Sequence, residues 1–274
     1  MDKWLSEPFN QSKTIAFVPT MGALHDGHLS LIEAANEKAN LTIASIFVNP
    51  KQFDNEEDLV KYPRQEAEDN HKLEQAGCDA VYLPTPEDLY DSNYSQVELD
   101  LEHLENIYEG EKREGHFEGV VQVLYQLFDC IQPNHVMFGQ KDYQQCMVVK
   151  RLLETYFPYT QLYKVPTFRD SEGLALSSRN QRLSDMGIEA AREFNKGLDI
   201  AIAQFNEENP LEALKAGKKH MQQMGIDVEY IDFADASNLN PCASWTNTPD
   251  EIVIVAACFV QGIRLIDNKV FSLK

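Results

Sequence analysis

One stretch of the sequence limits the possible folds more than any other. The apolar run Ile15–Val18 leads into the letters PTMGALHDGH, residues 19–28, and an amphipathic stretch follows. This order predicts a strand, a glycine-containing turn and the start of a helix. Exposed backbone N–H groups at a helix start attract anions, and glycine lets a ligand approach the backbone. Because His25 and His28 add two donors there, the turn is predicted to hold nucleotide phosphates.

Two other interpretations of His25 and His28 remain open. A zinc site would need a third ligand, and the sequence contains no compact group of Cys and His residues that supplies one. Alternatively, both rings cap the helix or pack in the core. Phosphate binding is favoured because the strand, the glycine turn and the helix start coincide at these two residues.

Strand-like and helix-like patterns alternate as far as about residue 165. Apolar runs predict strands at 14–19, 41–48, 80–83 and 136–138. Helical spacing of apolar residues is found in 31–39 and 120–131, and 65–76 is interpreted as a polar helix that Gly77 ends. Asp142 can cap a further helix with an apolar face from Cys146 to Tyr156. Alternation of this kind predicts an α/β domain with a doubly wound, Rossmann-like parallel sheet over residues 1–169.

The rest of the chain follows a different pattern. Helical spacing is followed by apolar strand-like runs, and the last of these runs is short. The predicted helices are 185–206 and 210–224, and the predicted strands are 227–233, 251–260 and 264–266. This order predicts a smaller α+β lid domain over residues 170–274, joined to the first domain near 169–177.

Acidic residues dominate the charge of the chain. The 274 residues include 24 Lys and Arg against 44 Asp and Glu, a formal net charge of −20. Such a charge opposes attraction to nucleic acid or anionic membranes, so neither partner is expected. The longest apolar run, Ile252–Val260, is too short to span a membrane, and the polar N-terminus lacks a signal peptide, which predicts a cytoplasmic protein. Five scattered cysteines are interpreted as buried thiols.

A second polar segment, FGQKDYQQ, also lies between a predicted strand and a predicted helix. Strand ends of a doubly wound sheet converge on one crevice, so Lys141 is expected to face the same phosphates as His28. The simpler interpretation is an exposed lysine beside Asp142, which caps the helix. The segment LSSRN combines serine hydroxyls with the planar donor fork of Arg179, as a phosphate clamp does, or it forms a plain loop between domains.

Two more segments carry polar groups at the ends of predicted elements. In FVNPKQF, the side chains of Asn49 and Gln52 suit the hydroxyls and carboxylate of a small polar substrate. The alternative is a loop with an Asx turn before proline. In REGHFEGV, Arg113 and His116 lie at a helix start, which is also typical of a simple capped helix.

Together these five segments resemble the pantoate–β-alanine ligase family of the HxGH nucleotidyltransferase superfamily, and the resemblance continues to Arg264–Asn268. It implies a homodimeric enzyme that uses ATP and Mg²⁺ to condense (R)-pantoate with β-alanine through a pantoyl-adenylate intermediate, releasing pyrophosphate and AMP. The main alternative is another nucleotidyltransferase of the superfamily with a phosphate acceptor. The neutral side chains of Gln52 and Gln145 favour a carboxylate-and-hydroxyl acceptor instead. A non-catalytic nucleotide-binding protein is the alternative from a different class.

The resemblance also assigns roles to individual residues. The implied catalytic group comprises His28, His25, Lys141, Ser177, Ser178 and Arg179. Contacts to ATP are implied for Met21, Gly22, Ala23, Leu24, His25, Asp26, Gly27, His28, Gly139, Gln140, Lys141, Asp142, Phe168, Leu176, Ser177, Ser178 and Arg179. Contacts to pantoate or β-alanine are implied for Gln52, Gln145, Asn49, Arg113 and His116. Acidic residues of some relatives approach the metal at the positions of Glu68 and Asp69, although the ATP phosphates chiefly hold Mg²⁺.

The sequence departs from the family pattern in two places. Glu114 follows the motif arginine where the family often has proline, which predicts a less rigid loop. The segment 259–263, FVQGI, differs from the commoner version with small residues and Gly-Lys. Because this segment belongs to the smaller domain, little effect on the chemistry is expected.

Overall fold

The computed structural model describes residues 2–7, 10, 12–53, 56–90 and 94–273. The chain forms two compact units. Unit 1 contains residues 1–140 and 144–166, and unit 2 contains residues 141–143 and 167–274. From the sequence, we expect the boundary between the two functional domains after residue 169. This boundary stays a prediction. Among the described residues, no helix combines the length and the apolar content that crossing a bilayer requires.

Unit 1 is built on a five-stranded parallel sheet, which confirms the predicted α/β class. The strand order is β3-β2-β1-β4-β5. The strands are β1 (Ile15–Thr20), β2 (Leu41–Ile46), β3 (Ala80–Tyr82), β4 (His135–Gly139) and β5 (Gln161–Val165). The chain order reverses between β1 and β4, and ligands of such sheets bind outside the carboxyl ends of the strands at this point. The turn that contains His25 and His28, which we call the histidine turn, directly follows β1.

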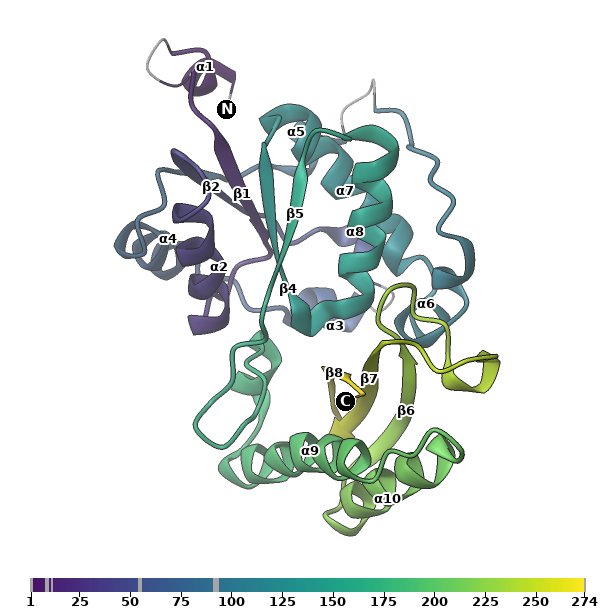
Figure 1. Ribbon diagram of the computed structural model, residues 1–274. Coiled ribbons are helices and arrows are strands. Elements are labelled where there is room, and N and C mark those ends of the chain that lie inside the picture. The colour runs from purple at the N-terminus through teal and green to yellow at the C-terminus, as the bar shows by residue number, and fades with distance from the viewer. Residues whose placement is uncertain (1, 8–9, 11, 54–55, 91–93, 274) are drawn as a thin grey trace. The chain divides into compact units, whose positions relative to one another are not determined.

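Helices cover both faces of this sheet. They are α1 (Asp2–Leu5), α2 (Asp26–Asn36), α3 (Glu56–Lys61), α4 (Glu66–Gln75), α5 (Pro86–Leu89), α6 (Tyr108–Lys112), α7 (His116–Ile131) and α8 (Tyr143–Tyr156). Figure 1 shows α2 and α4 on one face and α7 and α8 on the other. Side chains of β1 contact the helices on both faces of the sheet. Val18 packs in a cluster with Ile32 of α2 and Leu73 of α4. The neighbouring residue Phe17 meets Phe128 of α7 edge-on, with the ring centroids 6.1 Å apart. Successive side chains of a strand point to opposite faces, and the buried run Ile15–Val18 of β1 is apolar on both.

Unit 1 contains elements that the sequence pattern did not predict, among them β5 and the short helices α3, α5 and α6. Strand β5 was not predicted, because it is an edge strand whose residues are partly or fully exposed and whose apolar pattern is weak. The helix expected after a capping Asp142 begins at Tyr143, directly after a 3₁₀ turn over Gln140–Asp142.

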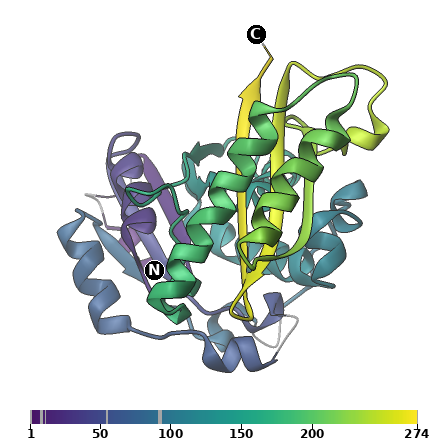
Figure 2. The same cartoon turned by 90° about the horizontal axis from the view of Figure 1, so that it is seen from below.

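Unit 2 is the predicted smaller α+β domain. Its antiparallel sheet has the order β6 (Asp227–Asp235), β7 (Glu251–Val260) and β8 (Ile263–Ser272). Helices α9 (Asp185–Ala203) and α10 (Pro210–Gln223) lie side by side along the sheet in Figure 2. Their buried side chains share one apolar core with the sheet. Gln261 and Gly262 both have positive φ, 52° and 74°, as the two-residue turn between β7 and β8 requires.

Candidate active site

The two histidines of the β1–α2 turn hydrogen-bond to the start of α2. His25 is the N-cap residue, and its Nδ1 accepts a hydrogen bond from the backbone N–H of Gly27 at 3.1 Å. The backbone N–H of His25 donates in turn to Nδ1 of His28 at 3.3 Å. This is a reciprocal capping box, and the two ring centroids lie 4.1 Å apart. The capping role that the sequence left open is therefore present.

Capping by Nδ1 determines what the other ring nitrogen can do. A ring nitrogen that accepts a hydrogen bond carries no proton, so the neutral forms of His25 and His28 carry theirs on Nε2. Each ring is then an oriented Nε2–H donor. Capping and phosphate binding use different nitrogens, so the two interpretations of the histidines are compatible.

Helix α4 fixes the shape of the loop that precedes the histidines. Gly22 and Ala23 have positive φ values of 81° and 51°. A Cβ atom on Gly22 would lie 2.9 Å from Oδ2 of Asp69, so a side chain there meets both strain and a close contact. Asp69 is fully buried, and its carboxylate accepts from the backbone N–H groups of Ala23 at 2.8 Å and Leu24 at 2.7 Å. Nζ of Lys72 donates to the carbonyl of Leu24 at 2.8 Å. Two residues of α4 thus hold Leu24 by its N–H and its carbonyl.

The same geometry bears on the predicted metal contacts of Glu68 and Asp69. Both oxygens of Asp69 already accept backbone hydrogen bonds, and Glu68 is exposed and paired with Lys72 at 2.8 Å. Nowhere in the described part of the chain do three or more His, Cys, Asp or Glu side chains gather as a metal site. These two residues do not fit a protein-bound Mg²⁺ ion, and their contact with a metal stays a prediction without structural support.

The anchoring role of Asp69 is testable by Asp69→Asn. The amide keeps the shape of the carboxylate but points an N–H₂ group at one backbone N–H. We expect a loss of about 3 kcal/mol in the free energy of unfolding, because charged hydrogen bonds are lost and a buried donor is left unpaired. Chemical denaturation measures the loss, and Glu68→Gln is the control, expected to cost less than about 1 kcal/mol. An equally small loss for Asp69→Asn would show that the carboxylate does not anchor the loop.

The segment after β2 holds Asn49 inside the protein. Its side chain accepts from the N–H of Lys51 at 3.2 Å, which is the Asx turn left open by the sequence, and from Tyr90 Oη at 2.9 Å. Its Nδ2 donates to Oε1 of Gln52 at 3.1 Å and to the carbonyl of Gly119 at 3.0 Å. Asn49 is 1% exposed. The geometry supports a role in shaping the segment, and a direct substrate contact of Asn49 stays a prediction.

Gln52 links three of the segments identified from the sequence. Its side-chain Nε2 lies 3.0 Å from Sδ of Met21 in the histidine turn. Its carbonyl accepts from Nδ1 of His116 at 2.7 Å, and Nε2 of that ring lies 2.9 Å from Nη1 of Arg113. Because the guanidinium is always a donor, Nε2 of His116 accepts and Nδ1 carries the proton. The structure thus brings Met21, Gln52, Arg113 and His116 together within unit 1.

Gln144 and Gln145 have different environments at the start of α8. Gln144 is buried: its Nε2 donates to the carbonyls of Leu104 and Ile107, at 2.7 and 3.0 Å, and its Oε1 accepts from the N–H of Glu109 at 2.9 Å. These bonds give Gln144 a structural role. Gln145 is partly exposed, which leaves its side chain as the candidate for a substrate contact.

In unit 2, a short hairpin joins two of the predicted ATP contacts. The N–H of Leu176 donates to the carbonyl of Phe168 at 3.0 Å, and Arg169 pairs with Ala175 one step further along. Ser177 follows, and its Oγ accepts from the N–H of Arg179 at 3.3 Å at the start of a 3₁₀ turn over Ser178–Arg182. Residues Leu176–Asn180, which we call the clamp segment, therefore form a defined turn at the end of a hairpin.

Lys141 and Asp142 lie in the same unit, in the turn after β4. Nζ of Lys141 lies 3.7 Å from Oδ1 of Asp142, and the lysine side chain is 16% exposed. The carbonyl of Lys141 accepts from Nδ2 of Asn268 at 2.8 Å. The preceding Gly139 has open space where a Cβ would lie.

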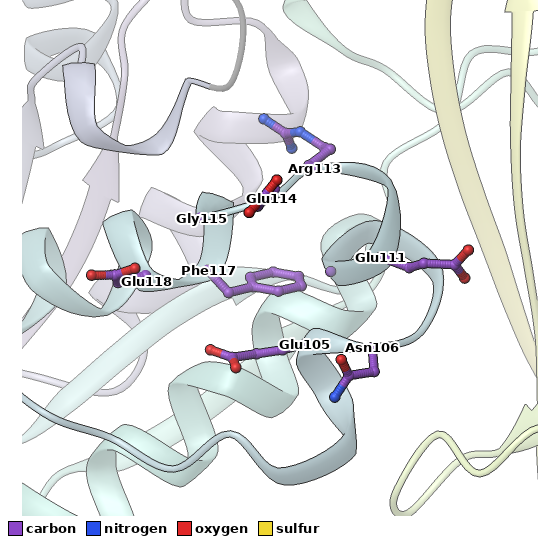
Figure 3. A pocket seen from close by; sticks show the side chains of 9 residues that line it. Glu105, Asn106, Glu111, Arg113, Glu114, Gly115, Phe117 and Glu118 are labelled. Carbon is purple, nitrogen blue, oxygen red and sulfur yellow. The ribbon is translucent and has the colours of Figure 1, made fainter.

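Unit 1 also contains a cavity of about 420 Å³ that does not coincide with the candidate site. Figure 3 shows the side chains that line it. It is lined by Glu105, Asn106, Gly110, Glu111, Arg113, Glu114, Gly115, Phe117 and Glu118. Four carboxylates against one guanidinium disfavour the anions that the sequence predicts as ligands. Of the predicted site residues, Arg113 alone lines this cavity, and its guanidinium also bonds to Gln52 and His116.

Sequence reasoning missed the supporting residues Lys72, Tyr90 and Asn268. Lys72 carries a weak signal, because it lies three residues after Asp69 on one face of a helix. Tyr90 and Asn268 act through hydrogen bonds to residues far away in the sequence. No local pattern marks Tyr90, and the motif Arg264–Asn268 contains Asn268 without indicating its role.

A Rossmann-like sheet whose first turn reads His-Asp-Gly-His defines the HxGH class of α/β nucleotidyltransferases. Within that class, the chain belongs to the pantoate-beta-alanine ligase family, whose sequence model matches residues 1–270.

Individual relatives agree with this assignment. The pantothenate synthetase of Cytophaga hutchinsonii is 39% identical over 98% of this chain and 95% of the relative. The crystal structure of pantothenate synthetase from Thermus thermophilus is 34% identical, with a TM-score of 0.85 over 93% of this chain and 92% of the other. The pantoate-beta-alanine ligase of Francisella tularensis, complexed with beta-gamma ATP and beta-alanine, is 35% identical, with a TM-score of 0.77 over 95% and 90% of the two chains.

Proposed function

We propose that this chain condenses pantoate with β-alanine to pantothenate, with ATP as the second substrate of the first step. The observation that carries the proposal is that His25 and His28 both use Nδ1 to cap α2, which orients Nε2 as the donor of each neutral ring, while Met21 of the same turn contacts the neutral side chain of Gln52. Membership of the family and the ATP and β-alanine in the Francisella relative support the same conclusion.

The reaction proceeds in two balanced steps. A carboxylate oxygen of pantoate bonds to the α-phosphorus of ATP, and the bond to pyrophosphate breaks. The amine of β-alanine then attacks the acyl carbon of pantoyl adenylate, loses a proton, and AMP leaves. The substrates supply both nucleophiles, so the enzyme contributes positioning, worth about 7–11 kcal/mol, and charge stabilisation.

The cysteines agree with a reaction that needs no thiolate. All five lie in the described part of the chain, and each is a thiol; three are buried as expected, and Cys78 and Cys130 are only partly buried. Burial raises the pKa of Cys78 to about 11, and burial together with the charge of Asp232 raises that of Cys242 to about 12. Thiols with such pKa values are protonated at neutral pH and are weak nucleophiles.

The roles proposed for unit 1 follow from its hydrogen bonds. His28, assisted by His25, donates from Nε2 to the oxygens of the departing pyrophosphate, where negative charge develops. Gln52 and Gln145 hold the hydroxyls and carboxylate of pantoate. Arg113 and His116 hold the backbone of Gln52 in place, and their direct contact with substrate stays part of the proposal.

The roles proposed for unit 2 concern ATP. Lys141 offsets the phosphate charge, and Ser177, Ser178 and Arg179 donate to phosphate oxygens. Phe168 offers its backbone to the adenine. The segments Met21–His28, Gly139–Asp142 and Leu176–Arg179 complete the proposed ATP contacts, and residues 170–274 form the proposed lid.

The remaining expectations rest on the family resemblance. Mg²⁺ enters with ATP as the MgATP substrate and is bound chiefly by phosphates, which agrees with the engaged carboxylate of Asp69. A homodimer and a cytoplasmic location stay predictions. The proposal as a whole is tested by mass spectrometry of a reaction with MgATP, pantoate and β-alanine. Pantothenate is the expected product, and its absence at saturating substrates would contradict the proposal.

Gln145 is expected to contribute to pantoate binding rather than to ATP binding. In Gln145→Ala, the KM for pantoate should rise about tenfold or more, because a hydrogen bond to a charged ligand is lost, while the KM for ATP changes less than about twofold. Steady-state kinetics with each substrate varied in turn measure both values. Gln222→Ala, at an exposed glutamine of α10, is the control. Equal losses for both substrates would argue against the role.

A further inference from the structure

Two adjacent polar residues, Asp267 and Asn268, are buried in the middle of β8. They are 4% and 2% exposed. Both residues belong to the segment Arg264–Asn268, to which the family resemblance extends. The proposed function gives neither of them a role. Burial of a charge and an amide costs free energy unless both find partners, so their hydrogen bonds show what they support.

Asp267 holds the hairpin that leads to the clamp segment. Its carboxylate accepts two hydrogen bonds from the guanidinium of Arg169, at 2.7 and 2.8 Å. Nη1 of Arg169 also donates to the carbonyl of Gly173 at 3.0 Å, and Arg169 pairs with Ala175 across the hairpin. Burial opposes the charge of this guanidinium, but the hydrogen bonds and charge of Asp267 prevail and raise the pKa of Arg169 above its usual value. The hairpin is thus tied to β8 by a partly buried ion pair.

Asn268 holds a different segment. Its Nδ2 donates to the carbonyl of Lys141 at 2.8 Å, across 127 positions of sequence. Its own N–H donates to Oδ1 of Asp267 at 2.7 Å, and its carbonyl accepts from Arg169 at 3.2 Å. Both neighbours on β8 therefore belong to one hydrogen-bonded network that includes Lys141 and Arg169.

This network joins two segments that the proposed function assigns to ATP. Lys141 comes from the turn after β4, and the hairpin from Phe168 to Leu176 leads into the clamp residues. We infer that Asp267 and Asn268 are positioning residues for ATP: they hold the backbone of Lys141 and the hairpin in fixed positions relative to each other. A preformed arrangement of phosphate donors lowers the cost of ordering them when ATP binds. The inference rests on the proposed function for the identity of the ligand.

Asn268→Leu tests the inference, because leucine matches the size of asparagine and adds no charge but cannot donate to Lys141. Isothermal titration with ATP alone should show affinity weakened about tenfold. The KM for pantoate should stay within about twofold of the wild-type value. Asn268→Ala is the second variant, with the same expected pattern should leucine prevent folding.

Glu229→Gln is the matched control, because it breaks the 2.7 Å ion pair of Glu229 with Arg264, on the same strand as Asn268. Thermal unfolding of all variants is recorded. The control is expected to bind ATP as the wild type does, even where its melting temperature falls as far as that of Asn268→Leu. Unchanged ATP affinity in folded Asn268 variants, or an equal loss in the control, would overturn the inference. A wrong proposed function would give a different result, because the wild-type enzyme would then release no pyrophosphate when pantoate is added.

Discussion

Replacement of His28 by asparagine is expected to lower the rate of adenylate formation by about 10²–10³-fold while the helix cap survives. Oδ1 of asparagine can accept the N–H of His25 as Nδ1 of the imidazole does, at 3.3 Å in the wild type. The shorter side chain lacks the distal Nε2–H donor. The rate of pantoate-dependent pyrophosphate release measures the loss, and the melting temperature reports whether α2 remains capped.

Two further variants at this position separate the roles of the ring nitrogens. His28→Gln carries an N–H donor at about the reach of Nε2, and it should recover part of the rate at some cost in stability. His28→Ala loses both functions. Wild-type turnover in His28→Asn would mean that the imidazole acts only as a cap, and the proposed assignment of the leaving-group donor would then be wrong.

Gly119→Ala is expected to destabilise unit 1 strongly, because Gly119 of α7 lies against the backbone of Lys51 and Gln52. A Cβ atom on Gly119 would lie 2.1 Å from the carbonyl oxygen of Lys51 and 2.7 Å from the nitrogen of Gln52. These are backbone atoms, so α7 and the segment after β2 must move apart. We expect a loss of about 3 kcal/mol in the free energy of unfolding and a raised KM for pantoate, because Gln52 moves with the segment. Chemical denaturation and pantoate kinetics measure the two effects.

A glycine with open surroundings provides the comparison. Gly225 has a positive φ of 77°, but a Cβ atom added there would meet nothing within 4 Å. Gly225→Ala should therefore cost only the strain of the left-handed conformation, about 1 kcal/mol. A Gly119→Ala protein as stable as Gly225→Ala would show that the two segments tolerate separation and that their close packing does not define the pantoate site.

The core of the fold was predictable because its strands are buried on both faces. Strands β1 and β2 appear in the sequence as nearly continuous apolar runs, and glycine marks the turn after β1. Strand β8 was predicted as only three residues, 264–266, and it extends over Ile263–Ser272. Asp267 and Asn268 interrupt its apolar pattern, although partners elsewhere in the fold make their burial possible.

Which segments meet at the site was predictable, because the strand ends of a doubly wound sheet converge on one crevice. The histidine turn and the segments of Gln52 and His116 come together as their motifs indicate. Asp69 shows the opposite case, because a carboxylate near phosphate-binding residues can bind a metal or anchor a loop. Its two hydrogen bonds reach back 45 and 46 positions in the sequence, and only the folded chain reveals them. Asn49 is similar, since the same amide serves a substrate or a buried turn.

The central claim is that a pantoate carboxylate attacks the α-phosphorus of ATP. The most direct measurement uses pantoate with heavy-isotope oxygen in its carboxylate, incubated with the enzyme, MgATP and β-alanine, and mass spectrometry of the AMP. Attack at the α-phosphorus predicts that one labelled oxygen appears in the phosphate of AMP and that pyrophosphate release requires pantoate. Unlabelled AMP, or pyrophosphate released equally without pantoate, would contradict the account.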